Sequence, residues 1–184
     1  MPLKIDPKYI DTYTALESLA SSPRNLAEAR LGIVRTALGL ERYTAVIEAS
    51  DRVLSSTASV NNESEIRYSR AVALDATGRH DEAYDEWRVL ASRPSQLYGA
   101  ASAVSLANSL LQRGNIKEAR KVIDTFLDAE TPHQYWQARG FIVLSDILRR
   151  QNQEFEADEY LRTLRTNYPG SEQDIIEMID LRLK

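Results

Sequence analysis

Apolar residues recur along most of the chain at intervals of three and four, the spacing that places them on one face of an α-helix. Strand-like alternation is almost absent. Two pairs, Asn25 with Glu28 and Asn62 with Glu65, have the spacing of a capping box, which marks the start of a helix. The pattern predicts about ten helices, at residues 7–20, 25–40, 43–56, 63–77, 81–92, 97–113, 117–129, 133–151, 154–167 and 171–183.

The connections between these helices are only a few residues long, so consecutive helices should lie antiparallel. No stretch has the composition of a flexible linker. The sequence therefore predicts a single all-α domain over residues 1–184.

One segment recurs four times. GRHDEAYDEWRVL begins at Gly78, GNIKEARKVIDTF at Gly114, NQEFEADEYLRTL at Asn152 and the more divergent ERYTAVIEASDRV at Glu41. The alanine of the pattern falls on Val46, Ala83, Ala119 and Ala157, at spacings of 37, 36 and 38 residues. Such a regular period predicts a stack of similar helix pairs.

This repeat resembles the tetratricopeptide repeat (TPR), which has a small residue midway in its first helix, a turn glycine and an alanine early in its second helix. The small position falls on Ala71, Ala107 and Ser145, with Val34 in the weakest copy. The resemblance implies an α-solenoid, a right-handed superhelix of antiparallel helix pairs. The expected pairs span residues 25–56, 63–92, 97–129 and 133–167.

The two ends differ from this pattern. Helix 7–20 resembles an isolated second helix, and we expect the chain to be the C-terminal part of a longer protein. Helix 171–183 carries its apolar residues on roughly one face, which favours a capping helix over a dimerisation surface. Those residues are Ile175, Ile176, Ile179 and Leu183.

In TPR proteins the first helices line a concave groove, and the resemblance implies which residues would face it here. They are Arg35, Tyr68, Asp75, Asn108, Gln112, Arg139, Asp146, Arg149 and Arg150. The basic C-terminal end of this set predicts a protein or peptide partner with an acidic segment, because arginine binds carboxylates bidentately. The alternative is that these arginines neutralise acids within the chain itself.

Composition excludes several other classes of function. The net charge is −4 and basic residues are scattered, unlike a nucleic-acid-binding surface. The chain has no cysteine, its two histidines lie in different repeats, and no catalytic motif is present. No apolar run is long enough for membrane insertion. We therefore expect a protein that is not an enzyme and that needs no cofactor or metal.

The sequence favours a non-catalytic interaction scaffold, either monomeric or weakly self-associating. The alternative is a structural self-association module of a larger envelope assembly. The segment LRTNYPGSEQD, which ends the last repeat, is similar to repeat endings of envelope-associated TPR proteins of Gram-negative bacteria. The resemblance favours a periplasmic or cell-envelope location over the cytoplasm.

Overall fold

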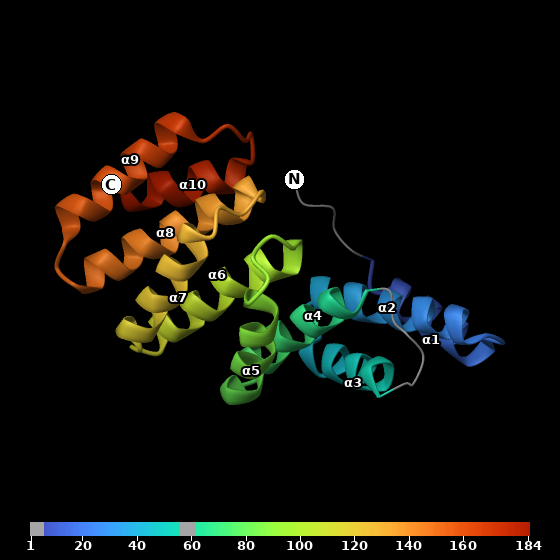
Figure 1. Ribbon diagram of the computed structural model, residues 1–184. Helices are drawn as coiled ribbons and strands as arrows, with labels where there is room; N and C mark the ends of the chain where they lie inside the picture. The colour runs from blue at the N-terminus through green and yellow to red at the C-terminus, as the bar shows by residue number, and fades with distance from the viewer. Residues whose placement is uncertain (1–5, 56–61) are drawn as a thin grey trace. The chain divides into compact units, whose positions relative to one another are not determined.

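The computed structural model describes residues 6–55 and 62–184, and these residues form ten α-helices without any strand (Figure 1). The prediction of an all-α fold is confirmed, and each observed helix begins and ends within two residues of its predicted bounds. The predicted end of the third helix, residue 56, lies outside the described residues. The helices are α1 (Lys8–Leu19), α2 (Pro23–Gly39), α3 (Tyr43–Leu54), α4 (Glu63–Ala76), α5 (His80–Ala91), α6 (Leu97–Gln112), α7 (Ile116–Asp128), α8 (Gln134–Arg150), α9 (Glu154–Asn167) and α10 (Gln173–Arg182).

The helices group into two compact units, Met1–Glu86 and Trp87–Lys184. In the first unit α2 packs against α1 and α3, and α4 packs against α2 and α3. In the second unit α8 packs against α6, α7 and α9, and α10 packs against α8 and α9. Helices thus pack in succession, as in a TPR-like solenoid. The prediction of a single domain over residues 1–184 stays a prediction.

Burial follows the repeat register through all four copies. The alanine position of the second helix is 0% exposed at Val46, Ala83, Ala119 and Ala157. The small position of the first helix is also 0% exposed, at Val34, Ala71, Ala107 and Ser145. Close helix approach requires small side chains at such contacts, because interiors are packed to crystal-like density.

The turn between the two helices of a pair has one conformation in all four repeats. A residue with positive φ occupies the same place each time: Glu41 (56°), Gly78 (84°), Gly114 (80°) and Asn152 (61°). The residue that follows donates its backbone N–H to the carbonyl five residues earlier, over 2.8–2.9 Å. This bond satisfies a carbonyl at the end of the first helix. The first and last repeats therefore keep the turn although they lack its glycine.

The two predicted capping boxes need correction. Asn25 does not cap α2, because Pro23 suits the first helical position and Ser22 Oγ accepts the Asn25 backbone N–H at 3.2 Å. Asn62 occupies the N-cap of α4, but its side chain makes no cap bond there. The Glu65 carboxylate pairs instead with Arg35.

Helix α1 is held to the first repeat by a close ring contact and by an ion-pair cluster. A Cβ atom at Gly32 would lie 2.3 Å from the Tyr13 ring, so only glycine lets α1 approach α2 here. Glu17 accepts hydrogen bonds from Arg30 at 2.7 Å and Arg52 at 3.1 Å. Burial raises the pKa of Glu17, but these bonds outweigh it, so that the pKa lies below its ordinary value.

Helix α10 occupies, relative to α8 and α9, the place that the first helix of a further repeat would take. Ile175 and Ile179 are fully buried in one cluster with Ala138, Ile142 and Leu161. Its apolar face is thus largely used within the second unit, as a capping helix requires. Within the described part of the chain, no helix combines the length and apolar character that a membrane span requires.

Candidate partner-binding surface

All nine predicted groove residues lie on the first helices of the repeats. Arg35 is on α2, Tyr68 and Asp75 are on α4, and Asn108 and Gln112 are on α6. Helix α8 carries the other four, Arg139, Asp146, Arg149 and Arg150. None of the nine side chains is buried, so each reaches the surface of its unit.

In the first unit Arg35 is held by Glu65. Its Nε and Nη2 atoms donate to the two carboxylate oxygens at 2.5 and 2.7 Å, a bidentate pair that joins α2 to α4. Glu65 is largely covered, with 12% of its side chain exposed, whereas Arg35 is 57% exposed. This pair therefore links the first helices of two successive repeats, and the Arg35 guanidinium stays partly exposed to solvent.

Asp75 lies at the end of α4, beside the turn into α5. Its Oδ1 atom is 2.7 Å from His80 Nδ1 at the start of α5. Both side chains are half-buried. This contact ties the two ends of the turn together, so Asp75 has a structural role in the repeat.

In the second unit two of the predicted groove residues fasten α10. The Asp146 carboxylate accepts two hydrogen bonds from Arg182, one from Nε and one from Nη2, each at 2.7 Å. Arg149 Nη2 donates to Asp158 at 2.5 Å and to the Arg182 carbonyl at 2.7 Å. Hydrogen bonds between ionised groups, such as these, are stronger than those between neutral groups. The Arg149 guanidinium thus joins α8, α9 and α10.

Arg139 lies beside two aromatic rings near the start of α8. Its guanidinium carbon is 5.7 Å from the Tyr135 ring centroid and 5.6 Å from that of Trp136, which is cation–π range. Arg139 Nη1 donates to Tyr135 Oη at 2.9 Å, and Tyr135 donates to Asp174 at 2.7 Å. Burial, with the Asp174 contact, raises the pKa of Tyr135.

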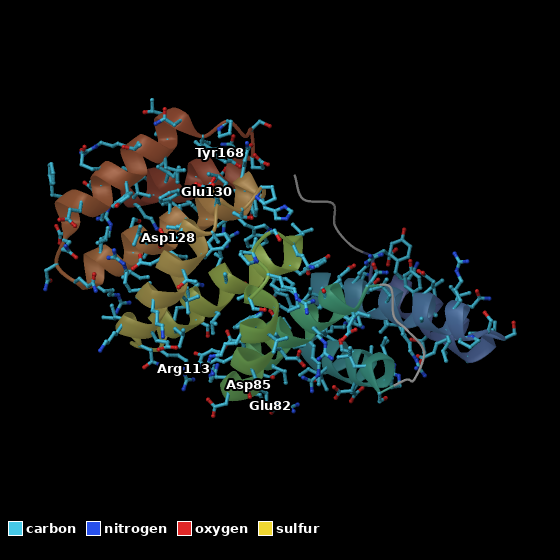
Figure 2. All side chains as sticks on the ribbon, viewed as in Figure 1. Glu82, Asp85, Arg113, Asp128, Glu130 and Tyr168 are labelled. Carbon is cyan, nitrogen blue, oxygen red and sulfur yellow. The ribbon has the colours of Figure 1, made fainter. Side chains whose placement is uncertain are left out.

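Within residues 6–55 and 62–184, three of the nine side chains make no hydrogen bond or ion pair: Asn108, Gln112 and Arg150. We call these three the groove patch. Gln112 and Arg150 end α6 and α8, which pack against each other. Gln112 is followed by Arg113, labelled in Figure 2, just before the Gly114 turn. The groove patch is thus polar and carries one cation.

The partners of the paired residues were not anticipated from sequence. Arg182 follows Asp146 by 36 residues, one repeat period, with the opposite charge. A search for opposite charges one period apart would have found this pair. Glu65 and Asp158 carry no comparable signal, because they lie 30 and 9 residues from their arginines.

Comparison with known families identifies one repeat directly. Residues 144–171 match the family model of the tetratricopeptide repeat. The match includes Ser145, Ala157 and Leu161, all fully buried positions of the fourth repeat. No curated protein sequence matches the chain. The family match and the helix packing together support a TPR protein, and repeats of this family generally mediate protein–protein interactions.

Proposed function

We propose that the chain is a non-catalytic scaffold that binds a protein or peptide partner through the groove patch of its second unit. The observation that carries this proposal is the contrast between two neighbouring arginines. Arg149 is engaged by α9 and α10, whereas Arg150 is exposed and is available to a carboxylate of a partner. A partner with an acidic segment fits a patch of two amides and one guanidinium.

Affinity capture with the chain as bait, followed by fluorescence anisotropy on the captured partner's acidic segment, tests this proposal. Arg150→Glu should weaken binding about tenfold or more, since it replaces attraction by repulsion. Lys117→Glu is the matched control, because Lys117 is an exposed cation on α7, a second helix. Equal weakening by both variants would mean general electrostatic attraction, and unchanged binding by Arg150→Glu would refute the groove patch.

A second candidate function is self-association as part of a larger envelope assembly, and it is favoured by α1. Leu16 and Leu19 are 49% and 78% exposed. They border a hollow of about 390 Å³ between α1 and α2, which also contacts Tyr13 and Ala29. Exposed apolar surface of this kind promotes association. Light scattering would show a mass that rises with concentration and returns to the monomer value in Leu16→Glu/Leu19→Glu, if this candidate is right.

A location in the bacterial cell envelope is part of the same proposal. Its support is the segment LRTNYPGSEQD, which spans the end of α9 and the connection to α10. Fractionation of the source cells, with an antibody against the chain, should recover it with periplasmic or membrane-associated markers. Recovery with cytoplasmic markers alone would refute the location.

A further inference from the structure

A mainly apolar cleft of about 400 Å³ lies between α8 and α9, outside the groove patch. Its floor contains Ala138, Phe141 and Leu164. The rings of Phe141 and Tyr160 lie 6.1 Å apart at 23°, a stacked arrangement, and Tyr160 is 43% exposed. Tyr168, labelled in Figure 2, lines the cleft at the α9–α10 connection. The cleft thus has one exposed aromatic ring, that of Tyr160, stacked on the half-buried ring of Phe141.

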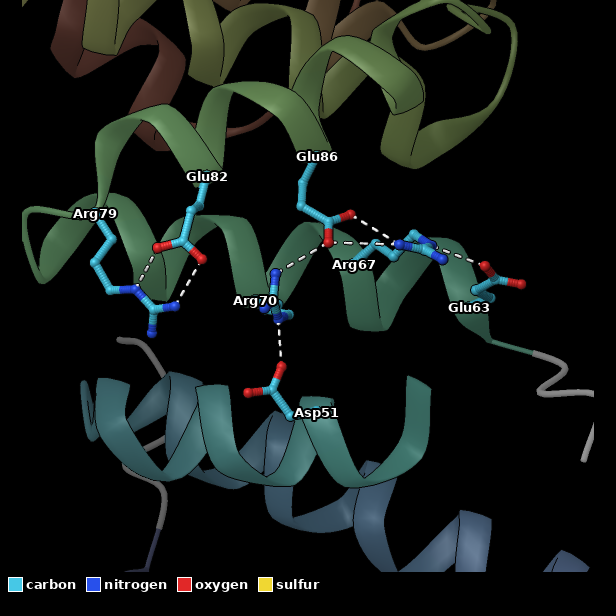
Figure 3. A network of polar contacts seen from close by, with 7 residues as sticks. All are labelled: Asp51, Glu63, Arg67, Arg70, Arg79, Glu82 and Glu86. Atoms are coloured by element: carbon cyan, nitrogen blue, oxygen red, sulfur yellow. Dashed lines mark hydrogen bonds and ion pairs between the residues drawn. The ribbon is translucent and has the colours of Figure 1, made fainter. Parts of the chain in front are cut away.

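The second repeat shows that the fold does not require these rings. Phe141 and Tyr160 follow Arg67 and Glu86 by 74 residues, two repeat lengths, and so occupy the same positions of the helix pair. Arg67 Nη1 lies 3.1 Å from Glu86 Oε2, and this ion pair joins α4 and α5 at the corresponding place (Figure 3). The same backbone position therefore tolerates a water-compatible ion pair.

The polar rim of the cleft is uncharged. It consists of Gln134 and Gln137 on α8 and of Thr163 and Asn167 at the end of α9. Primary amides offer both donors and acceptors, as a peptide backbone does. A rim of neutral amides around an apolar floor suits a peptide whose side chain enters the cleft and whose backbone remains at the mouth.

Beside the cleft, the exposed surface of α9 is acidic. Glu156 precedes Tyr160 by four residues and therefore lies one turn away on the same side of the helix. Glu156 accepts a bond from the neutral Gln153, so its charge is not compensated by that contact. Glu159 pairs with Arg162, which is 58% exposed and also approaches Asp158. Asp158 is already engaged by Arg149, so Arg162 mainly offsets Glu159, and Glu156 has a neutral partner. A basic partner segment is complementary to the charge of Glu156.

We propose that the cleft between α8 and α9 is a docking site for a peptide segment that presents a large apolar side chain beside lysine or arginine. The apolar side chain packs on Phe141 and Tyr160, and the amide rim holds the backbone. The basic residue lies over Glu156. This site extends the proposed function, because it uses no groove residue and selects the opposite charge.

The second repeat supplies the test variant. Phe141→Arg/Tyr160→Glu copies the Arg67–Glu86 pair into the fourth repeat, so the helix pair should remain folded, with its far-UV circular dichroism unchanged. The probes are short synthetic peptides with a central Trp flanked by Lys, a central Trp flanked by Glu, and a central Ser flanked by Lys. Binding is measured by fluorescence anisotropy on the full chain.

The Lys-flanked Trp peptide should bind the unmodified chain about tenfold or more tighter than either other peptide, and the double variant should lose that preference. Arg150→Glu should leave it unchanged, which separates this site from the groove patch. Equal binding of all three peptides, or full binding to the double variant, would overturn the proposal.

A second variant covers the case in which the double variant fails to fold. Glu156→Lys changes one exposed residue and should selectively weaken binding of the peptide with a central Trp flanked by Lys. Unchanged affinity in Glu156→Lys would overturn the charge assignment. A concentration-dependent dimer that Tyr160→Glu dissociates would show that a second copy of the chain, and not a basic peptide, occupies the cleft.

Discussion

The repeated turn allows the cost of a positive φ to be measured inside one protein. Gly78 and Gly114 hold this conformation without strain, whereas Glu41 holds it at 56° with a side chain. We expect Glu41→Gly to stabilise the chain and Gly114→Ala to destabilise it. A Cβ atom at Gly114 would meet no atom within 4 Å, so the second change tests backbone strain alone.

The magnitude follows from two opposing terms. For a residue with a Cβ atom, the left-handed region raises the free energy of the folded state by about 1–2 kcal/mol. Glycine loses more conformational entropy on folding than alanine does, which costs about 0.5–1 kcal/mol of folding free energy. Glu41→Gly should therefore raise the free energy of unfolding by roughly 0.5–1 kcal/mol, and Gly114→Ala should lower it by a similar amount. For a chain of this size, about 1 kcal/mol shifts the melting temperature by about 2–4 °C.

Thermal unfolding followed by circular dichroism is the assay, with both variants measured beside the unmodified chain. Gly99→Ala is a steric reference, because its Cβ atom would lie 2.0 Å from the Arg93 carbonyl oxygen. That variant should lose clearly more stability than Gly114→Ala. Melting temperatures that shift in the same direction for Glu41→Gly and Gly114→Ala would refute the argument from backbone conformation.

Three further predictions concern packing and charge. Ala119→Leu should cost about 1–3 kcal/mol in urea unfolding, because Ala119 is fully buried at the helix contact, and an unchanged midpoint would contradict the repeat register. Glu17→Gln should destabilise the chain at pH 7. Since the folded pKa of Glu17 is lowered, its contribution is present above the unfolded value of 4.5 and is lost as pH falls through the folded value, so the difference from the unmodified chain should shrink at acid pH. A difference that persists there would contradict the ion-pair explanation. Arg149→Ala should lose about 1–2 kcal/mol through its bonds to α9 and α10, whereas Arg150→Ala should change unfolding by less than about 0.5 kcal/mol.

The architecture was predictable because it rests on local signals that repeat. The buried position held by Val46, Ala83, Ala119 and Ala157 recurs once per repeat, so its spacing gives the register. Turn glycines were a weaker signal, since Glu41 and Asn152 adopt the same backbone without glycine. The predicted capping residue was wrong where two candidates lie close together: Ser22, and not Asn25, caps α2.

The contacts of the predicted groove residues were less predictable, because they depend on side-chain partners in neighbouring helices. The sequence places Arg149 and Arg150 at similar positions, and nothing in either residue distinguishes them. The distinction arises from α10, whose last turn brings the Arg182 carbonyl to Arg149, while Asp158 of α9 approaches the same guanidinium. The capping helix thereby engages one of the two arginines of the predicted groove, Arg149, and leaves Arg150 without a bond from α10. Removal of α10 contacts should therefore change partner charge preference as well as stability: Asp146→Asn, which weakens the bidentate Arg182 pair, should reduce stability and increase the affinity for acidic peptides. If stability fell while affinity for acidic peptides stayed the same, the charge of Arg149 would have no influence on binding.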